Sequence, residues 1–222
     1  MAWRCSGNSN NDLIDNMIQS NLIRSKSVES ALRQTDRGNY APSDCYADSP
    51  QRIGFNVTIS APHMHAHALE ELKNHVRPGS KVLDVGCGSG YLTAAMGRMV
   101  GSQGKVVGLD YVRGLTDLTT KNIKKSDGDL LESGVVEIVL GDGWQGWEAH
   151  APYDAIHVGA AAATLPRTLI EQLKPGGRMI IPVGPQGGSQ YLLGVNKSSD
   201  GKSFTKEQLM GVRYVPLVQK HY

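Results

Sequence analysis

The feature that most constrains this chain is a regular alternation of strand-like and helix-like segments between residues 81 and 183. Short runs of Val, Ile and Leu alternate there with longer amphipathic runs. Parallel strands need long crossover connections, usually helices, so the alternation predicts an α/β fold with a mostly parallel central sheet and helices on both faces. We predict strands at residues 81–85, 105–110, 135–140, 153–158 and 178–183, and helices at 91–100, 113–125 and 165–173, the last closed by Pro175-Gly176-Gly177.

The segments before and after this core do not alternate regularly between strand-like and helix-like runs. Apolar spacing predicts a helix at residues 12–21 and a second helix capped by Ser27, and residues 42–54 are polar, interrupted by proline and predicted to be irregular. A further helix is expected to begin at Pro62. At the other end, two strand-like runs with no helix between them predict an antiparallel edge of the sheet. These runs are residues 190–197 and 209–217.

The composition indicates an ordinary water-soluble globular chain. Its 222 residues suffice for one substantial core, so we expect a single domain over residues 1–222, with residues 1–61 as a helical and irregular N-terminal cover. The formal net charge of +2 gives no reason to expect a nucleic acid or membrane partner. The three cysteines form no CxxC pair, and the first eight residues lack the apolar run of a signal peptide. We therefore expect a cytoplasmic monomer.

The sharpest local motif is the run Asp84-Val85-Gly86-Cys87-Gly88-Ser89-Gly90, which lies where the first predicted strand gives way to a helix. Ligands of open α/β sheets bind at the carboxyl ends of strands, and glycines there let a ligand approach the backbone closely. The spacing differs from the dinucleotide fingerprint G-x-G-x-x-G. Asp84 would repel a pyrophosphate but suits a ligand with a cationic amino group. We predict that Gly86, Gly88, Ser89 and Gly90 bind S-adenosyl-L-methionine, although a turn without a ligand is an alternative.

Two more acidic residues lie at or just after the ends of neighbouring predicted strands. Asp110 ends the second strand, where a carboxylate can accept both ribose hydroxyls of a nucleoside. Asp142-Gly143 follows the third strand and can reach the adenine. Each acid alone could be a helix cap or a solvated turn. Together with Asp84 these two acids favour a cationic nucleoside as the ligand. They therefore predict a Rossmann-like class I methyltransferase fold, and the spacing does not identify the methyl acceptor.

Other segments carry a resemblance over nearly the whole chain. The segment Ile53-Gly54-Phe55-Asn56-Val57-Thr58-Ile59-Ser60-Ala61-Pro62-His63-Met64-His65-Ala66 resembles the signature of the protein L-isoaspartate (D-aspartate) O-methyltransferases, whereas the glycine loop is shared by many methyltransferases. Further stretches are similar to this family. They are Ala2-Trp3, Thr35-Asp36-Arg37, residues 151–160, residues 173–178, Pro182-Val183-Gly184-Pro185 and Tyr214-Val215-Pro216-Leu217.

The resemblance implies a methyltransferase acting on damaged proteins and peptides. Its acceptor would be the free α-carboxylate of an L-isoaspartyl or D-aspartyl residue, its cofactor S-adenosyl-L-methionine and its product S-adenosyl-L-homocysteine. Ser60 corresponds to the active-site serine of the family. Positions that match residues lining the cofactor or the acceptor are Val57, Thr58, Ile59, His65, Ser89, Asp110, Asp142 and Gly143.

Four positions depart from the family pattern. Val218 stands where the family usually has a threonine that reaches the site from the tail, and Trp144 replaces a usual arginine. Ala163 replaces a proline, and Cys87 stands where serine is common. None of these changes removes a carboxylate or Ser60, so they affect the expected cofactor contacts of the tail more than the expected activity.

The implied reaction needs no general base, because an acceptor carboxylate with an ordinary pKa near 3.9 is already ionised at neutral pH. Catalysis can come from alignment of the reacting groups and exclusion of water, an effect that can reach roughly 7–11 kcal/mol. We therefore expect Ser60 to orient the reactants and not to act as a nucleophile.

Several other interpretations of these residues stay open. His63, His65 and His67 could bind zinc if they shared one face of a strand, but alternate residues of the predicted helix diverge, so no metal is expected. Ser60 and His63 lack the nucleophile elbow of a hydrolase. Trp144 and Trp147 could form an acceptor platform, although packing is the simpler interpretation. A methyltransferase for another acceptor, or a non-enzymatic binding module, would share the glycine loop.

Overall fold

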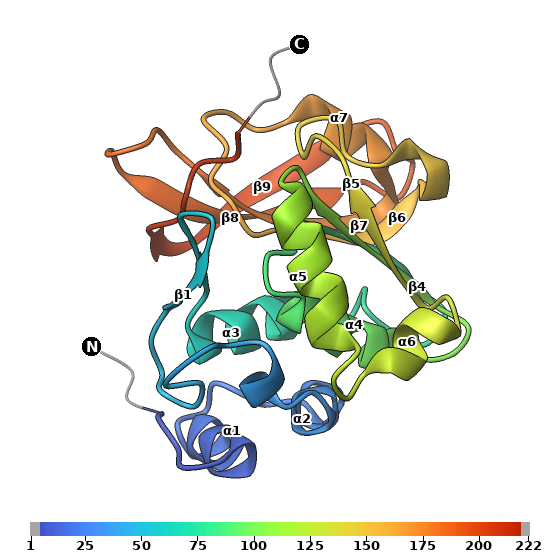
Figure 1. Cartoon of the computed structure of the whole chain (residues 1–222). Helices are drawn as coiled ribbons and strands as arrows, with labels where there is room; N and C mark the ends of the chain where they lie inside the picture. The colour runs from blue at the N-terminus through green and yellow to red at the C-terminus, as the bar shows by residue number, and fades with distance from the viewer. Residues whose placement is uncertain (1–4, 219–222) are drawn as a thin grey trace.

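The computed structural model describes residues 5–218, so Ala2 and Trp3 lie outside the described residues. Seven strands form the central sheet in the order β5-β4-β3-β6-β7-β8-β9 (Figure 1). The parallel strands are β3 (Lys81–Val85), β4 (Lys105–Asp110), β5 (Val136–Leu140), β6 (Tyr153–Val158) and β7 (Leu173–Val183). The antiparallel edge consists of β8 (Gln190–Lys197) and β9 (Phe204–Val212). The predicted fold class, including its antiparallel edge, is confirmed.

The strands of this sheet bury side chains on both faces. Val82 of β3 and Val106 of β4 belong to one apolar cluster, and their neighbours Leu83 and Val107 belong to another. This alternation follows from the two-residue period of a strand. The first cluster includes residues of α3 (Pro62–Leu72), α4 (Tyr91–Val100), α5 (Arg113–Ile123) and α6 (Gly128–Glu132), and the second includes residues of α7 (Arg167–Gln172).

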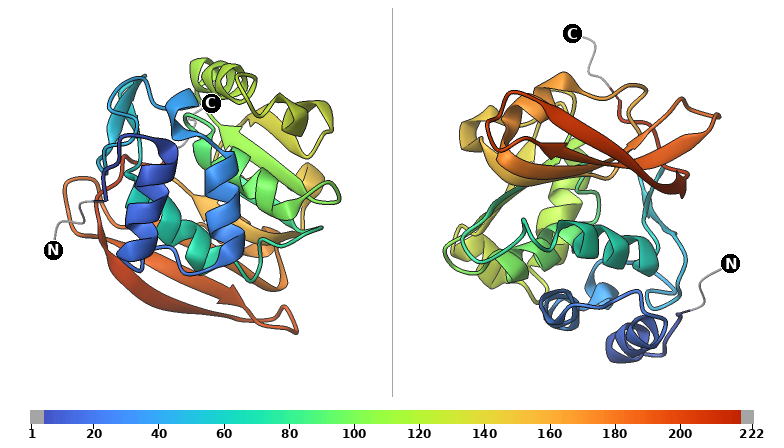
Figure 2. Two further views of the ribbon diagram at one scale, coloured as in Figure 1. Left: turned by 90° about the horizontal axis from the view of Figure 1, so that it is seen from below. Right: turned by 180° about the vertical axis from the view of Figure 1, so that it is seen from behind.

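The N-terminal segment forms the outermost layer. Its elements are α1 (Asn10–Gln19), α2 (Lys26–Gln34) and the 3₁₀ turn η1 (Arg37–Asn39). Figures 1 and 2 show α1 and α2 outside the layer that contains α3 and α4. As the sequence predicts, α2 buries Val28, Ala31 and Leu32. The N-terminal segment is therefore packed on the helix layer and contributes to the same core.

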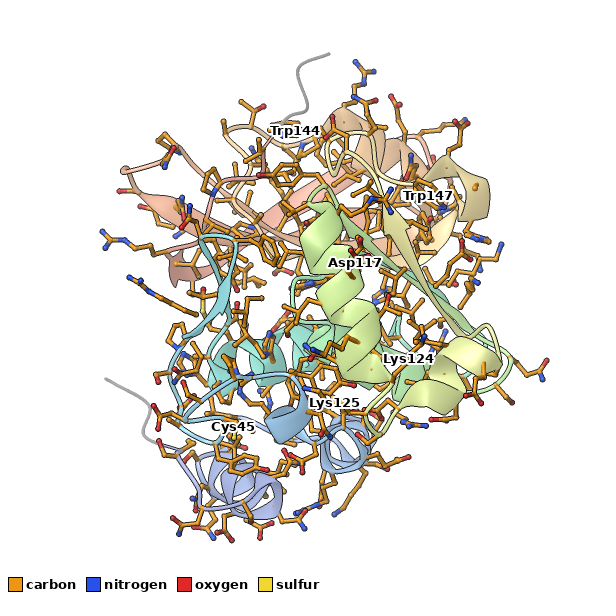
Figure 3. The ribbon with its side chains drawn as sticks, in the orientation of Figure 1. Cys45, Asp117, Lys124, Lys125, Trp144 and Trp147 are labelled. Atoms are coloured by element: carbon orange, nitrogen blue, oxygen red, sulfur yellow. The ribbon has the colours of Figure 1, made fainter. Side chains whose placement is uncertain are left out.

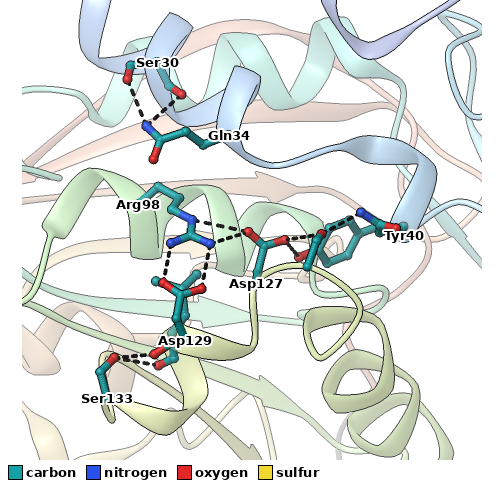
Figure 4. A network of polar contacts seen from close by, with 10 residues as sticks. Ser30, Gln34, Tyr40, Arg98, Asp127, Asp129 and Ser133 are labelled. Carbon is teal, nitrogen blue, oxygen red and sulfur yellow. Dashed lines mark hydrogen bonds and ion pairs between the residues drawn. The ribbon is translucent and has the colours of Figure 1, made fainter.

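A polar network fastens this outer layer to the helices beneath it (Figure 4). The Tyr40 hydroxyl donates to Oδ2 of the fully buried Asp127 at 2.5 Å. Arg98 of α4 donates to Oδ1 of Asp127 at 2.7 Å and also pairs with Asp129. One buried carboxylate thus joins three segments, and its charge is compensated by Arg98.

A second anchor is the carboxylate of Glu70 on α3, which is 4% exposed. Its Oε1 accepts hydrogen bonds from the backbone N–H groups of Arg24 and Ser25, both at 2.8 Å, and from the Ser25 hydroxyl at 2.7 Å. Lys73 pairs with Oε2 at 2.9 Å. The prediction that Ser27 caps α2 is wrong. The N-cap is Ser25, whose hydroxyl makes no capping bond and bonds to Glu70 instead.

We expect Glu70→Gln to lower stability at neutral pH. Burial raises the pKa of Glu70, but the bonds from Arg24, Ser25 and Lys73 outweigh burial and lower the pKa from 4.5 to about 2. A depressed pKa stabilises the fold above pH 4.5, and this contribution is lost as the pH falls toward 2. The shift corresponds to about 3 kcal/mol at most.

Urea unfolding at pH 7 and pH 3 measures this contribution. The difference between wild type and Glu70→Gln should shrink by more than half at pH 3, and the exposed control Glu171→Gln should change little at either pH. An equal loss for Glu70→Gln at both pH values would mean that the carboxylate acts through its shape and not its charge.

The structure corrects the sequence analysis in the region predicted to be irregular. Its last four residues form β1 (Gln51–Gly54), which pairs in a hairpin with β2 (Val57–Ile59) just beyond it. Its two turn residues, Phe55 and Asn56, both have positive φ, at 51° and 58°. Asparagine tolerates positive φ but phenylalanine rarely adopts it, so the sequence lacks the Asn-Gly or Asp-Gly pair that usually marks such a turn.

Boundaries near the antiparallel edge also differ. The strand β9 spans Phe204–Val212, not residues 209–217 as predicted, because Gly194–Lys197 of β8 pair with Phe204–Glu207. Pro175-Gly176-Gly177 lies inside β7 and does not end a helix before it, and the pairing of β6 with β7 shifts register at this point. The helix α6 was not predicted. Its five residues are too few for a periodic pattern.

Candidate active site

The predicted site residues of the sheet gather at the carboxyl ends of β3, β4 and β5. Since β3 has β4 on one side and β6 on the other, the strand order reverses here, and open α/β sheets bind ligands at such a point. A cavity of about 430 Å³ opens there. Its wall includes Val85, Leu109, Asp110, Leu115 and Gly143. The cavity therefore has an apolar body with one carboxylate at its wall.

The glycine loop gives this cavity its backbone wall. Gly86 and Gly88 line it with φ values of 77° and 55°, which glycine adopts without strain. Gly159, after β6, lies so close that a Cβ there would be 3.0 Å from the Gly86 carbonyl. Gly90 is different. It is the N-cap of α4, and a Cβ there would lie 2.7 Å from the Thr119 methyl group. It lines none of the three cavities of the site.

Asp110 lies at the cavity wall as predicted. It is 6% exposed, and its carboxylate accepts the N–H of Gly88 at 3.2 Å and of Val112 at 3.1 Å. Burial raises the pKa of Asp110, and these backbone donors oppose the shift. On the next strand end, Gly143 lines the cavity, while Asp142 Oδ1 accepts the N–H of Trp144 at 2.9 Å.

Asp84 does not line this large cavity. It is 1% exposed, and its two oxygens bond to His157 Nδ1 at 2.7 Å and to the Thr93 hydroxyl at 2.5 Å. It borders a smaller cavity of about 40 Å³, together with Ile59, Ser60, His65 and Ser89. The acid of the glycine motif thus contributes to a polar pocket beside the main cavity.

Ser60 lies in the loop between β2 and α3, where the small cavity meets a third cavity of about 590 Å³. Arg37 donates to the Ser60 carbonyl at 2.8 Å. Burial raises the pKa of Tyr214, and a hydrogen bond with the Ser60 side chain opposes this shift. Thr58 lines all three cavities, and Val57 lines the first. Ser60 therefore lies between the small polar cavity beside the first cavity and an open groove.

His65 is 8% exposed and packs against the Tyr91 ring at 5.1 Å between centroids. Its Nδ1 lies 3.2 Å from Nη1 of Arg37. Burial lowers the pKa of His65 well below 6.5, and the positive charge of Arg37 lowers it further. The imidazole is therefore neutral at physiological pH.

The C-terminal tail, residues 213–218, reaches the site beside Ala161, with which Pro216 forms a parallel β-bridge. Ala161 donates to the Val215 carbonyl and accepts from the Leu217 N–H, both at 2.8 Å. Trp144 Nε1 donates to the Leu217 carbonyl at 3.0 Å, so the tryptophan that replaces the usual arginine secures the tail. Val218 lines the first cavity and is 39% exposed.

The two tryptophans pack against the second core cluster (Figure 3). Neither Trp144 nor Trp147 lines any of the three cavities. This arrangement supports the packing interpretation and not the acceptor platform.

The histidine triplet is dispersed. His63 Nδ1 bonds to Asp48 at 2.7 Å and His65 bonds to Arg37. Within residues 5–218, no three His, Cys, Asp or Glu side chains are placed to hold a metal ion, and no hydrogen bond joins the Ser60 hydroxyl to His63. Neither the zinc nor the hydrolase alternative gains support.

Several site residues were missed by the sequence analysis. Phe55 and Asn56 come from the hairpin tip, and Tyr111 follows Asp110. Gly159 follows the fourth parallel strand, and its position at a strand end was the signal that could have revealed it. Arg37 and His157 reach the site from distant segments, and no local pattern indicates their role.

Comparisons with known proteins agree with this geometry. The family model of protein-L-isoaspartate(D-aspartate) O-methyltransferases matches residues 8–222. The chain is 48% identical to the protein-L-isoaspartate O-methyltransferase of Caenorhabditis elegans, covering 99% of this chain and 97% of that protein. It is 47% identical to protein-L-isoaspartate O-methyltransferase 1 of Arabidopsis thaliana, covering 96% and 93%.

A solved structure extends the match to three dimensions. A Plasmodium falciparum protein-L-isoaspartate O-methyltransferase, crystallised with S-adenosyl-L-homocysteine, superposes with a TM-score of 0.89 at 35% identity, over 96% of this chain and all of that chain. The sheet and its glycine loop thus define an S-adenosyl-L-methionine-dependent methyltransferase. More narrowly, the chain belongs to the protein-L-isoaspartate(D-aspartate) O-methyltransferase family.

Proposed function

We propose that the chain repairs damaged proteins by methylating the free α-carboxylate of L-isoaspartyl residues and the free side-chain carboxylate of D-aspartyl residues. A carboxylate oxygen forms a bond to the methyl carbon, the carbon–sulfur bond breaks, and its electron pair stays on sulfur. The products are a methyl ester and S-adenosyl-L-homocysteine. The observation that carries this proposal is the position of Ser60, where the cavity for the cofactor meets an open groove able to admit a peptide.

The residues around the first two cavities suit S-adenosyl-L-methionine. Leu109 and Leu115 offer apolar walls for the adenine, and Asp110 offers acceptors for the ribose hydroxyls. The small cavity offers polar groups for the amino acid end. The proposed cofactor-binding set is Val57, Thr58, Ile59, His65, Asp84, Gly86, Gly88, Ser89, Asp110, Asp142 and Gly143, with Gly90 supporting the turn into α4.

Ser60 is proposed to orient the acceptor carboxylate beside the methyl group. Its carbonyl accepts a hydrogen bond from Arg37, and Tyr214 lies beside its side chain, so the residue has a restricted position. A fixed donor can align a carboxylate that already carries its negative charge, and no proton has to be removed from it.

We further propose that the protein works as a cytoplasmic monomer without a nucleic acid or membrane partner, and that residues 1–61 are the cover of a single domain. The net charge of +2 and the packing of α2 against α3 and α4 support this. Over the described part of the chain, no helix combines the length and apolarity needed to cross a bilayer.

Tritiated S-adenosyl-L-methionine, offered with paired peptides that differ only in aspartyl or isoaspartyl linkage, tests the proposed acceptor. We expect base-labile label in the isoaspartyl peptide and far less in its partner, because only the isoaspartyl residue places a free α-carboxylate on a kinked main chain. Equal labelling of both peptides would reject the repair function and leave a carboxyl methyltransferase of another specificity.

The family usually has a threonine at the position of Val218, and this difference gives a prediction for Val218→Thr. Val218 lines the first cavity but cannot donate a hydrogen bond, whereas threonine can. We expect the substitution to strengthen cofactor or acceptor binding by about 0.5–1.5 kcal/mol. Calorimetry with S-adenosyl-L-homocysteine, and peptide titration, would detect it. Val218→Ala is the control without a hydroxyl, and no gain in either assay would show that the tail does not present this side chain to the ligands.

A further inference from the structure

The first cavity and the open groove meet at five residues that border both of them. These residues are Thr58, Gly159, Gln186, Val215 and Pro216. Glycine, valine and proline side chains form no hydrogen bonds, so only Thr58 and Gln186 offer polar side chains there. The amide of Gln186 is therefore the longest polar group at the junction between the proposed sites of the methyl donor and the acceptor.

Gln186 lies in the turn between β7 and β8, residues 184–189. The residue is exposed, and its amide has no hydrogen-bond partner among residues 5–218. Gly187 and Gly188 follow it directly, and Gly187 has a φ of 77°. Glycine adopts this conformation without strain, so the turn holds the amide at the junction without fixing it to another part of the protein.

Gln190, four positions further along the chain, shows how a glutamine amide can bind a main chain in this protein. Its Oε1 accepts the N–H of Tyr214 at 2.7 Å, and its Nε2 donates to the Tyr214 carbonyl at 3.4 Å. Gln190 is 6% exposed and borders the same groove. One amide thus pairs with both polar main-chain groups of one residue, a contact that does not depend on the side chain of that residue.

The proposed acceptors have their main chain in common and not their side chains. An isoaspartyl residue continues the chain through its side-chain carboxyl group, and ordinary peptide groups, which donate and accept hydrogen bonds, lie on both sides of it. Arg213 also borders the groove, but a guanidinium only donates, and its charge distinguishes acidic from basic sequences. An uncharged amide that donates and accepts is better suited to bind many different sequences.

We propose that Gln186 binds the acceptor, its side-chain amide pairing with the main-chain N–H and carbonyl of a residue beside the isoaspartyl residue. This inference rests on the function proposed above and names the main chain as the part of the substrate that the groove recognises. Gln186 then holds the peptide at the junction of cavity and groove, while Ser60 orients its carboxylate.

Steady-state kinetics of Gln186→Ala, with isoaspartyl peptides that differ in their flanking residues, gives the first test. We expect KM to rise on the order of tenfold for every peptide, the effect of two ordinary hydrogen bonds, while kcat changes little. The matched control is Gln208→Ala, because Gln208 is an exposed glutamine of β9 that borders none of the three cavities. An unchanged KM, or a rise for one sequence alone, would contradict the proposal.

Peptides in which a single amide near the isoaspartyl residue is replaced by an ester identify the contact directly. The ester lacks the N–H group, so one of these peptides should have a raised KM with the wild type and with Gln208→Ala. The same ester should have no further effect on KM in Gln186→Ala. If every ester multiplies the KM of wild type and Gln186→Ala by the same factor, Gln186 does not bind the main chain.

Calorimetry with S-adenosyl-L-homocysteine separates acceptor binding from cofactor binding, since Gln186 also borders the first cavity. Gln186→Ala should retain the wild-type affinity, and thermal unfolding should be unaltered because the side chain is exposed and unpaired within the described chain. A loss of cofactor affinity as large as the rise in KM would assign Gln186 to the cofactor and overturn the inference. If the wild type methylates no isoaspartyl peptide, the proposed function itself is wrong, whereas normal methylation without the ester coupling rejects only the role of Gln186.

Discussion

Replacing Asp110 by alanine is expected to lower the affinity for S-adenosyl-L-homocysteine at least tenfold while the protein stays folded. Asp110 is the only acid among the described residues that border the first cavity, and it is proposed to accept both ribose hydroxyls. Hydrogen bonds to charged groups contribute about 1.5–3 kcal/mol each. Loss of both bonds is therefore expected to lower the affinity by more than tenfold.

Two comparisons make this measurement specific. Asp110→Asn keeps the size of the side chain but removes its charge, and should give a smaller loss than alanine. Asp117→Ala removes an exposed carboxylate from α5, the helix that follows, and should leave affinity unchanged (Figure 3). Calorimetry on all three variants, with thermal unfolding to verify the fold, gives the ranking. Unchanged affinity in a folded Asp110→Ala variant would show that this carboxylate does not hold the ribose.

The sequence predicts the central strands closely because their signal is local. The predicted boundaries of β3, β4 and β6 are those of the structure, since each is a short apolar run ended by glycine or a polar residue. The glycine loop is equally local, because the residues that turn the chain also form the wall of the cavity.

Other parts of the site depend on contacts between distant segments. Arg37 meets His65 across 28 positions and Asp84 meets His157 across 73. No periodicity encodes such pairs, so Arg37 was noticed only within a stretch that resembles the family. The contacts of Asp84 could not be predicted from the sequence for the same reason. The sequence places it correctly at the end of β3, but only the folded chain shows that His157 and Thr93 occupy its oxygens.

Replacing Ser60 by alanine is expected to lower kcat/KM for an isoaspartyl peptide on the order of 10²-fold, the effect of misplacing reacting groups by about 1 Å. Cofactor affinity should change much less, because Asp110 and the glycine loop are untouched. The exposed Ser43→Ala is the matched control and should retain full activity. Single-turnover rates and calorimetry separate the two effects. A loss of cofactor affinity as large as the loss of rate would place Ser60 in cofactor binding and not in alignment.

The pH dependence of the chemical step tests the same mechanism from another side. The acceptor carboxylate, with an ordinary pKa near 3.9, is ionised throughout pH 6–8. His65 does not change charge in this range, because burial and Arg37 hold its pKa well below 6.5. The wild-type rate should therefore be nearly flat from pH 6 to 8. A steep rise with an apparent pKa near 7 would reveal a general base, with His63 the first to replace, and a trapped methyl or acyl group on Ser60 would exclude direct transfer.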